Sequence, residues 1–354
     1  MGGDESDAIE EASAPDARTD LAVVVPKPET GDAIARLRAA GVYDDTRRVR
    51  EHDDDHIELP VVVPPDSVDG RVIEQPDPAP RVAGLDDLLA ERGFSETEIA
   101  AAPNAWAVIG DVVLVRFDGC PRREEVAREL LDLQSAETVL DRKGIDGEFR
   151  EPDVEVVAGS GETETVHTEH GTTYALDLAT VMFCPGNKRE RVRMGEAVDA
   201  DERVLDAFAG IGYFTLPMAR AGAEVTAIER NPEAFRHLIE NVPLNGVDDR
   251  VRPFRADCRD AVEAFAETDE TFDRVVMGYY DAFEYLDPVL SVLAEGGVVH
   301  MHEATPEAEL PGRPVDRLRA AAESMNRTVE VLDQRRVKTH SEGVSHVVVD
   351  ARIG

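Results

Sequence analysis

The chain has 354 residues, 42% of them hydrophobic, which is long enough for two or three domains with buried cores. Its 74 acidic residues outnumber its 38 basic residues, so the net charge is −36. No apolar run approaches the ~20 residues that span a membrane, and the acidic, polar start lacks a secretory pattern. Three widely spaced cysteines without a CxxC pair argue against a zinc site and indicate a reducing, cytoplasmic setting.

The acid surplus has two interpretations. Only four residues are lysines, and arginine supplies the other basic residues. A lysine-poor, acid-rich composition is typical of halophilic proteins, in which a solvated acidic surface preserves solubility in concentrated salt. Alternatively, the protein avoids nucleic acid, since nucleic-acid-binding proteins usually present a basic face. Composition alone leaves both interpretations open.

The first 84 residues predict a tail, a small domain and a linker. Residues 1–20 are acidic and polar, as in a disordered tail. Residues 21–63 predict a small α+β domain of βαβ-like order, in which two apolar runs flank a helix with Leu37 on its apolar face. Residues 64–84 are rich in prolines and acids, which is the composition of a linker.

Residues 85–196 predict a mixed α+β domain associated with RNA and cofactor. Two alternating strands flank Gly110-Asp111, a helix runs from Glu124 to Leu133, and three strand-like runs follow. The Glu169-His170-Gly171 step predicts a hairpin turn.

Residues 197–354 alternate between strand-like runs and amphipathic helices. This alternation predicts right-handed crossovers and a parallel sheet with helices on both faces. The last two strand-like runs have no helix between them, so we expect one of them to run antiparallel at the sheet edge.

The most informative motif is a strand that ends on Asp206 and continues into a loop containing Phe208, Gly210 and Gly212. The glycines let backbone approach a ligand, and the helix that follows offers free N–H donors. Glu229 ends the next strand, 23 residues later, at the spacing of an acid that takes ribose hydroxyls. The Asp-x-Phe-x-Gly-x-Gly pattern is that of S-adenosylmethionine (SAM) enzymes. It predicts a class I SAM-dependent methyltransferase fold, a Rossmann-like α/β architecture.

The later strand ends add polar groups at the same edge of the sheet. Asn231 opens the helix after Glu229, Asp257-Cys258 follows the third strand, and Gly278 follows the fourth. Asp257 is placed to accept a hydrogen bond from the adenine amino group. It is equally suited to cap the next helix, and the two roles can coexist.

A basic segment at residues 182–194 precedes this domain. It holds four basic residues within six positions: Lys188, Arg189, Arg191 and Arg193. Arg191 is predicted to clamp the cofactor carboxylate with its planar fork, and the other three are predicted to meet phosphates. The alternative is a solvated helix start, with Asn187 and Glu190 forming a capping-box-like arrangement.

Two further pairs of side chains are candidates for the site. One pair follows the fourth strand, and the other lies on the fifth. Tyr279 and Tyr280 are candidates to stack on a flat base, or else they pack in the ordinary way. His300 and His302 share one strand face and are candidates to contact RNA phosphate or to accept a proton. The alternatives for the histidines are a sheet-end hydrogen bond and a metal pair. No third ligand lies nearby in sequence, so we predict no metal.

Residues 174–196 and 204–260, with the runs VVMGYY, VVHMHEATPE and EGVSHVVVDARI, resemble the archaeal wybutosine-synthesis aminocarboxypropyltransferases. That family belongs to the superfamily of the tRNA guanine-37 N1-methyltransferases. The likeness covers roughly residues 85–354. Residues 21–63 additionally resemble the small N-terminal domain of the N1-methyltransferases, which many members of the aminocarboxypropyl branch lack.

The resemblance implies a monomeric, SAM-dependent enzyme acting on the anticodon loop of tRNA(Phe). The 3-amino-3-carboxypropyl group would move to C7 of 4-demethylwyosine at position 37, and methylthioadenosine would leave. The strand end Met277-Gly278-Tyr279 lacks the Asn and Pro residues of the methyl-transferring branch, which favours this reaction. The alternatives are an N1-methyltransferase for guanine 37 and a non-catalytic SAM-binding RNA chaperone.

These arguments give a predicted site in three groups. The cofactor-binding residues are Cys184, Arg191, Asp206, Phe208, Gly210, Gly212, Glu229, Asn231, Asp257, Cys258 and Gly278. The substrate- or RNA-binding residues are Asn187, Lys188, Arg189, Arg193, Tyr279 and Tyr280. The catalytic candidates are His300 and His302.

Overall fold

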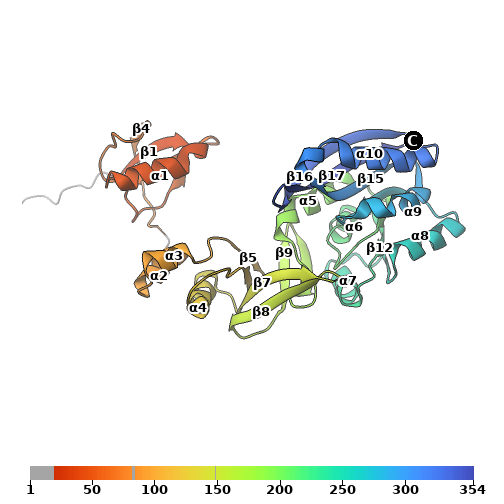
Figure 1. Cartoon of the computed structure of the whole chain (residues 1–354), viewed down its shortest axis with the longest axis horizontal. Helices are drawn as coiled ribbons and strands as arrows, with labels where there is room; N and C mark the ends of the chain where they lie inside the picture. Colours follow the sequence, from red (N-terminus) through yellow and green to blue (C-terminus); the bar gives the residue numbers. More distant parts are fainter. Residues whose placement is uncertain (1–19, 82–83, 148) are drawn as a thin grey trace, which may run out of the picture. The chain divides into compact units, whose positions relative to one another are not determined.

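The computed structural model describes residues 20–81, 84–147 and 149–354, and it divides into two compact units between Leu88 and Leu89 (Figure 1). The acidic tail predicted at residues 1–20 lies outside the described residues, apart from Asp20. The two units are described separately below.

The N-terminal unit is a four-stranded sheet with one helix packed on it. Its elements are β1 (Leu21–Pro26), a short 3-10 turn (Lys27–Glu29), α1 (Thr30–Ala39), β2 (Arg50–Glu51), β3 (His56–Val61) and β4 (Arg71–Glu74). The strand order is β2-β3-β1-β4, and Leu37 of α1 is fully buried against the sheet.

Two expectations for this unit need correction. β1 and β3 pair antiparallel, so the helix does not make the parallel crossover of a βαβ unit. Residues 71–74, assigned to the linker, form β4 and pair with β1. The apolar strand β1 is therefore hydrogen-bonded along both of its edges. The strand β4 could not be predicted from composition, because it has only four residues and lies among prolines and acids.

The second unit begins with a small mixed domain. Its elements are α2 (Leu85–Glu91, which spans the division), α3 (Glu96–Ala100), β5 (Trp106–Ile109), β6 (Val112–Val115), α4 (Arg123–Gln134), β7 (Thr138–Asp146) and β8 (Glu151–Gly159). The strands form a sheet in the order β5-β6-β7-β8, in which β6 and β7 are parallel.

A separate hairpin, β9 (Glu164–Glu169) and β10 (Thr172–Asp177), links this domain to the next. His170 and Gly171 both have positive φ, 47° and 78°, as a tight two-residue turn requires, so the predicted turn is confirmed. Asn241 and Asn245 of the following domain hydrogen-bond to the backbone of β10, at 2.7 Å to Ala175 N and 2.9 Å to Thr173 N. These amide bonds hold the hairpin against the last domain.

The last domain is a seven-stranded sheet of order β13-β12-β11-β14-β15-β17-β16. Its strands are β11 (Arg203–Asp206), β12 (Glu224–Ile228), β13 (Val251–Phe254), β14 (Phe272–Met277), β15 (Leu293–Pro306), β16 (Val329–Ser341) and β17 (Val344–Ile353). The first five pair in parallel, as expected. The antiparallel strand is β17, which lies inside the sheet, whereas β16 forms the edge.

Helices cover both faces of this sheet (Figure 1). The helices are α5 (Lys188–Ala197), α6 (Thr215–Ala221), α7 (Pro232–Leu244), α8 (Cys258–Glu267), α9 (Leu286–Ser291) and α10 (Gly312–Ser324), with 3-10 turns at Pro185–Asn187, Ala282–Tyr285 and Glu307–Glu309. Apolar residues of α6 and α7 share one core, and those of α8, α9 and α10 share the other.

The helix after β14 is short: α9 ends at Ser291, and β15 begins at Leu293. Within the described parts of the chain, no helix combines the length and apolar character needed to cross a membrane.

Candidate functional site

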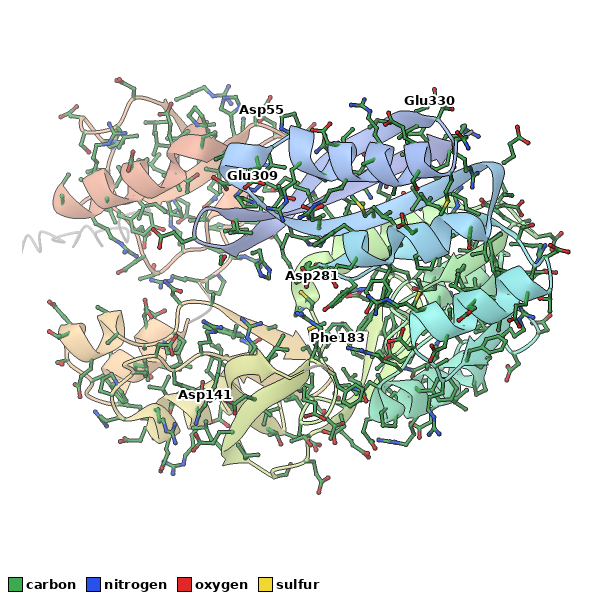
Figure 2. All side chains as sticks on the ribbon, turned by 45° about the vertical axis from the view of Figure 1, so that its right-hand side comes forward. Asp55, Asp141, Phe183, Asp281, Glu309 and Glu330 are labelled. Carbon is green, nitrogen blue, oxygen red and sulfur yellow. The ribbon has the colours of Figure 1, made fainter. Side chains whose placement is uncertain are left out.

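A cavity of about 1040 Å³ lies at the carboxyl ends of β11, β12, β13 and β14. The sheet β5-β6-β7 forms a second wall, with Trp106 and Ile145, and the β16-β17 hairpin forms a third, with His340 and His346. Open parallel sheets bind ligands at this edge. The walls come from both domains of the second unit, and Phe183 lies where they meet (Figure 2).

The loop after β11 is held against Glu229. The Glu229 carboxylate accepts hydrogen bonds from Gly210 N at 2.8 Å and Asn231 N at 2.6 Å, and burial raises its pKa. A Cβ on Gly210, where φ is 57°, would lie 2.6 Å from the ring of Tyr213. Only glycine therefore fits, and the loop presents its backbone to the cavity. The Arg230 backbone N–H is a third donor to this carboxylate. A carboxylate has about four lone-pair sites, so Glu229 can still accept a hydrogen bond from a ligand hydroxyl.

Asp206 and Gly212 lie behind this loop and do not line the cavity. Asp206 is fully buried, accepts a hydrogen bond from the Thr215 hydroxyl at 2.7 Å, and has a pKa raised to about 6 by that burial. A Cβ on Gly212 would lie 2.8 Å from Leu216. Both residues shape the loop from within, whereas Phe208 and Gly210 face the cavity.

Aromatic rings and Asp257 mark one end of the cavity. Phe208 packs against Tyr279 and Tyr285, with ring centroids 5.3 and 5.0 Å away. Asp257 caps α8, accepting a hydrogen bond from Arg259 N at 2.9 Å, so the predicted helix cap is confirmed. Asp257 also lines the cavity, and its contact with adenine stays a prediction. Burial raises the pKa of the neighbouring Cys258 thiol to about 12, so that residue offers an apolar surface.

The basic segment contributes its loop to the cavity and not its helix. Cys184 and Asn187 line the cavity, whereas Arg191 is buried outside it. The Arg191 Nε donates to Glu169, and its Nη1 donates to the Cys184 carbonyl at 3.0 Å. Burial alone would raise the pKa of Glu169, but hydrogen bonds from His167 and Arg191 outweigh it and hold that pKa at about 2. Arg191 therefore supports the loop from behind.

The remaining basic residues of α5 lie outside the cavity. Lys188 and Arg189 are exposed at the start of the helix, and Arg193 pairs with Asp333 at 2.7 Å. The capping-box alternative is wrong in detail: Asn187 makes no side-chain cap, and Glu190 accepts hydrogen bonds from Arg335 at 2.9 and 2.6 Å. A buried carboxylate gains more from a guanidinium than from one backbone N–H.

Tyr279 and Tyr280 both line the cavity, at the end of β14. The Tyr280 ring meets the rings of His340 and His346 edge-on, at centroid distances of 4.7 and 4.8 Å. The Arg150 guanidinium lies 5.2 Å from the same ring. Gly278 precedes them, and a Cβ there would approach Phe214 to 2.8 Å, so the strand end is closely packed.

The two candidate histidines occupy different environments. His300 uses both ring nitrogens, bonding to Asp350 at 2.7 Å and to Arg274 at 2.6 Å, and it does not line the cavity. His302 lines the cavity, bonds through Nδ1 to His346 Nε2 at 3.0 Å, and leaves its Nε2 without a partner among the described residues. Burial lowers the pKa of both histidines, so both are neutral.

Sequence reasoning missed five basic residues in the cavity wall: Arg116, Arg142, Arg150, Arg230 and Lys338. Arg230 pairs with Asp257 at 3.6 Å, whereas the other four form no ion pair within the described parts of the chain. The carboxylates lining the cavity are those of Glu229 and Asp257, so the cavity is basic inside a strongly acidic protein. The five residues come from β7, β16 and the loops after β6, β7 and β12, and no local motif connects them.

Within the described residues, no group of histidine, cysteine and acidic side chains is arranged to hold a metal ion.

Two family profiles match consecutive parts of the chain. The TYW2 N-terminal domain matches residues 85–163, and the TRM5/TYW2 methyltransferase domain matches residues 165–332. The tRNA(Phe) (4-demethylwyosine(37)-C(7)) aminocarboxypropyltransferase of Pyrococcus horikoshii is 38% identical, over 77% of this chain and 99% of its own. The tRNA (guanine(37)-N(1))-methyltransferase Trm5b of Pyrococcus abyssi is 29% identical, over 94% of this chain and 99% of its own.

Solved structures agree with the profiles. P. horikoshii TYW2 in complex with MeSAdo has a TM-score of 0.65 at 33% identity, covering 76% of this chain and 97% of its own. M. jannaschii TYW2 in complex with AdoMet has a TM-score of 0.56 at 34% identity, covering 70% and 99%. These similarities support the class I SAM-dependent α/β fold predicted from the motifs.

Proposed function

We propose a function from the premise that this chain belongs to the TRM5/TYW2 family, as an aminocarboxypropyltransferase. It is a SAM-dependent enzyme that transfers the 3-amino-3-carboxypropyl group to C7 of 4-demethylwyosine at position 37 of tRNA(Phe), with release of methylthioadenosine. The observation that carries the proposal is one cavity that joins the Gly210–Glu229 loop to Tyr279, Tyr280 and His302. Cofactor and base would meet there.

The residues present fit SAM. The Gly210 backbone gives close approach, Glu229 keeps lone pairs for ribose hydroxyls, and Asp257 stands beside the aromatic rings that suit adenine. SAM supplies an electrophilic carbon next to its sulfonium. The choice between its carbons depends on which one lies ~3–3.5 Å from the nucleophile, so the protein's task is mainly positioning.

We assign proton removal to His302 and a structural role to His300. When C7 forms its new bond, its C–H bond must break, the electron pair returns to the ring, and a proton needs an acceptor. His302 is neutral, lines the cavity and has a free Nε2, and its Nδ1 is bonded to His346. His300 has both nitrogens engaged in the sheet.

The tRNA is held, in this proposal, by the basic wall of the cavity. Arg116, Arg142 and Arg150 face it from the middle domain, and Tyr280 offers a ring for stacking. We assign Lys188 and Arg189, exposed beside the loop, to backbone phosphates further along the anticodon loop. The acidic exterior then does not exclude nucleic acid, because the contact surface is locally basic.

We further propose that the protein works as a monomer in the cytoplasm of a salt-adapted cell. The lysine-poor, acidic composition supports adaptation to salt.

The experiment that tests the function is co-product analysis. The purified protein is incubated with SAM and with tRNA(Phe) carrying 4-demethylwyosine, and the nucleosides are separated by chromatography. We expect methylthioadenosine in stoichiometric amount with the modified base. S-adenosylhomocysteine as the main co-product would contradict the proposal.

A further inference from the structure

Lys338 stands out among the few lysines of this chain. Lys27 and Lys143 pair with Glu51 and Glu155, and Lys188 is exposed at the start of α5. Of the four, only Lys338, on β16, lines the cavity.

The Lys338 ammonium has no carboxylate partner among the described residues. Its Nζ lies 2.6 Å from the Cys184 Sγ, a weak acceptor. Its stem runs over Gly186, where a Cβ would lie 3.3 Å from the Lys338 Cδ. The amine is thus held at the cavity wall by the loop of residues 184–186, with its charge uncompensated in a protein of net charge −36. An uncompensated, partly buried cation is suited to an anionic ligand.

Neighbouring contacts locate Lys338 away from the adenine end. Phe183, next to Cys184, packs its ring 5.8 Å from that of Tyr213, whose edge closes on Gly210. On the other side, burial lowers the pKa of His340, and the nearby positive charges of Arg150 and then Lys338 lower it further. The His340 ring contacts that of Tyr280 at a centroid distance of 4.7 Å. Lys338 therefore lies between the glycine loop after β11 and the end of β14. Asp257 and Tyr285 mark the other end of the cavity.

We propose that Lys338 binds the α-carboxylate of the methionine portion of SAM. This inference rests on the proposed function, which places SAM in the cavity. It replaces the predicted role of Arg191, whose Nε and Nη1 are bonded to Glu169 and Cys184 and which does not line the cavity. On SAM binding, the carboxylate takes the place of the Cys184 thiol as the partner of the ammonium.

A lysine suits this reaction better than an arginine. In aminocarboxypropyl transfer the carboxylate belongs to the group that moves, so its anchor must follow it towards the base. A two-pronged arginine–carboxylate pair fixes geometry, whereas an ammonium on a flexible four-carbon stem keeps its contact through a displacement. Lys338 thereby aligns the γ-carbon and still releases the product.

The test compares three ligands by calorimetry, each titrated alone: SAM, decarboxylated SAM and tRNA(Phe). Lys338→Met keeps the stem and removes the charge. SAM is compared with decarboxylated SAM, which retains the sulfonium and the amine and lacks only the carboxylate. We expect Lys338→Met to weaken SAM binding by ~10-fold or more, the scale of one charge-assisted hydrogen bond, and to leave the binding of decarboxylated SAM unchanged or stronger. Lys27→Met, in the N-terminal unit and outside the cavity lining, is the matched control and should bind these ligands as the wild type does.

Three results would overturn the inference. Equal weakening of both ligands would mean that the stem packs against the cofactor and the charge is not used. Unchanged SAM affinity with weakened tRNA binding would assign the ammonium to an RNA phosphate. Unchanged binding of all three ligands would leave the amine without a ligand role. The test is independent of the reaction: if the enzyme proved to transfer methyl, the proposed function would fail while the carboxylate discrimination would still stand.

Discussion

Glu229 is the residue whose substitution tests the cofactor site most directly. Glu229→Ala removes the acceptor proposed for the ribose hydroxyls and frees the N–H groups of Gly210 and Asn231. Hydrogen bonds to a charged partner contribute ~1.5–3 kcal/mol, so SAM affinity should fall at least tenfold by calorimetry. Circular dichroism checks that the fold persists. Wild-type affinity in a folded variant would remove Glu229 from the cofactor site.

His302 is the residue to test for proton removal. His302→Asn keeps a polar group and abolishes the basic ring nitrogen, so transfer should slow by ~10²-fold, the lower range for loss of a general base. Single-turnover rates are measured with tRNA carrying hydrogen or deuterium at C7. We expect the isotope effect to be larger in the variant than in the wild type, because loss of the proton becomes limiting.

The matched control for His302 is His340→Asn on the same wall. His340 contacts Tyr280 but has no hydrogen bond to His302, so its substitution should leave the isotope effect at the wild-type value. A normal transfer rate in His302→Asn, or the same isotope effect in both variants, would assign proton removal to another group or to water.

Sequence analysis correctly predicted those cavity residues that lie close together in the sequence. Phe208, Gly210 and Glu229 belong to one strand–loop–helix–strand pattern whose geometry is fixed by local rules. The burial of Arg191 against Glu169 could not be predicted, because Glu169 lies on a hairpin that no local pattern connects to Arg191. Lys338 was missed because a bulged edge strand brings it to the cavity from 154 residues beyond Cys184.

At the scale of elements, a buried charge network ties α5 to the C-terminal strands. Arg335 of β16 binds Glu190 of α5 and Asp350 of β17, and Asp350 binds His300 of β15. Burial would raise the pKa of Asp350, but hydrogen bonds from His300 and Arg335 lower it well below its usual range. This network sets the position of α5 and of the Cys184 loop that precedes it.

These elements make stability depend on pH. Burial lowers the pKa of His300 and His302, and that of His346 to about 3. The unfolded chain binds protons at these histidines below its own pKa of ~6.5 while the native chain does not, so stability is lost as pH falls below that value. Asp206 and Glu229 act in the opposite direction, since burial raises their native pKa values, that of Asp206 to about 6, which favours the folded state as pH falls. Three histidines outweigh two carboxyls.

The measurement is the melting temperature of the wild type and of His346→Gln at pH values of about 7.5 and about 5. We expect the wild type to lose stability at the lower pH and the variant to lose less. The same loss in both proteins would mean that His346 is protonated, or exposed, in the native state.

The order of elements was largely predictable, and the pairing of the edge elements was not. Alternating strands and helices predict the parallel core of β11 to β15, because crossover handedness leaves few arrangements. β17 and β4 differ from expectation because pairing partners far apart in sequence decide an edge. In the N-terminal unit, the pattern of two strands around a helix is compatible with parallel or with antiparallel pairing of the strands. The short strands β2 and β4, which pair with β3 and β1, complete the antiparallel sheet and were not predicted.

For the whole molecule, charge separates into an acidic exterior and a basic cavity. Acids such as Glu309 and Glu330 lie exposed on the surface (Figure 2), and the repulsion among them is relieved by salt. We expect the melting temperature to rise from low to molar potassium chloride. A flat or falling melting temperature would contradict adaptation to salt. Since phosphate contacts weaken in the same salt, tRNA affinity should depend on stacking at Tyr280 more than in a low-salt enzyme.

The whole chain also bears on the choice between two reactions of one family. The aminocarboxypropyltransferase of P. horikoshii aligns with 77% of this chain at 38% identity, while the Trm5b alignment covers 94% at 29% identity and so takes in most of the N-terminal unit. Both reactions are substitutions at a carbon of the same sulfonium, so the site geometry, and not the extra domain, decides which group moves. The strand end Met277-Gly278-Tyr279-Tyr280 supports movement of the larger group.

Label transfer from SAM separates these reactions in the full-length protein. SAM labelled in the methyl group and SAM labelled in the carboxyl group are supplied in parallel to tRNA(Phe) carrying 4-demethylwyosine and to tRNA(Phe) with guanine at position 37. We expect carboxyl label on the first tRNA and no methyl label on either, because Lys338 and the β14 end hold the γ-carbon towards the base. Lys338→Met should lower the carboxyl transfer without creating methyl transfer, since the base remains where Tyr280 holds it. Methyl label on guanine 37 would show that the N-terminal unit accompanies the methyl-transferring activity, and it would reassign the chain within the family.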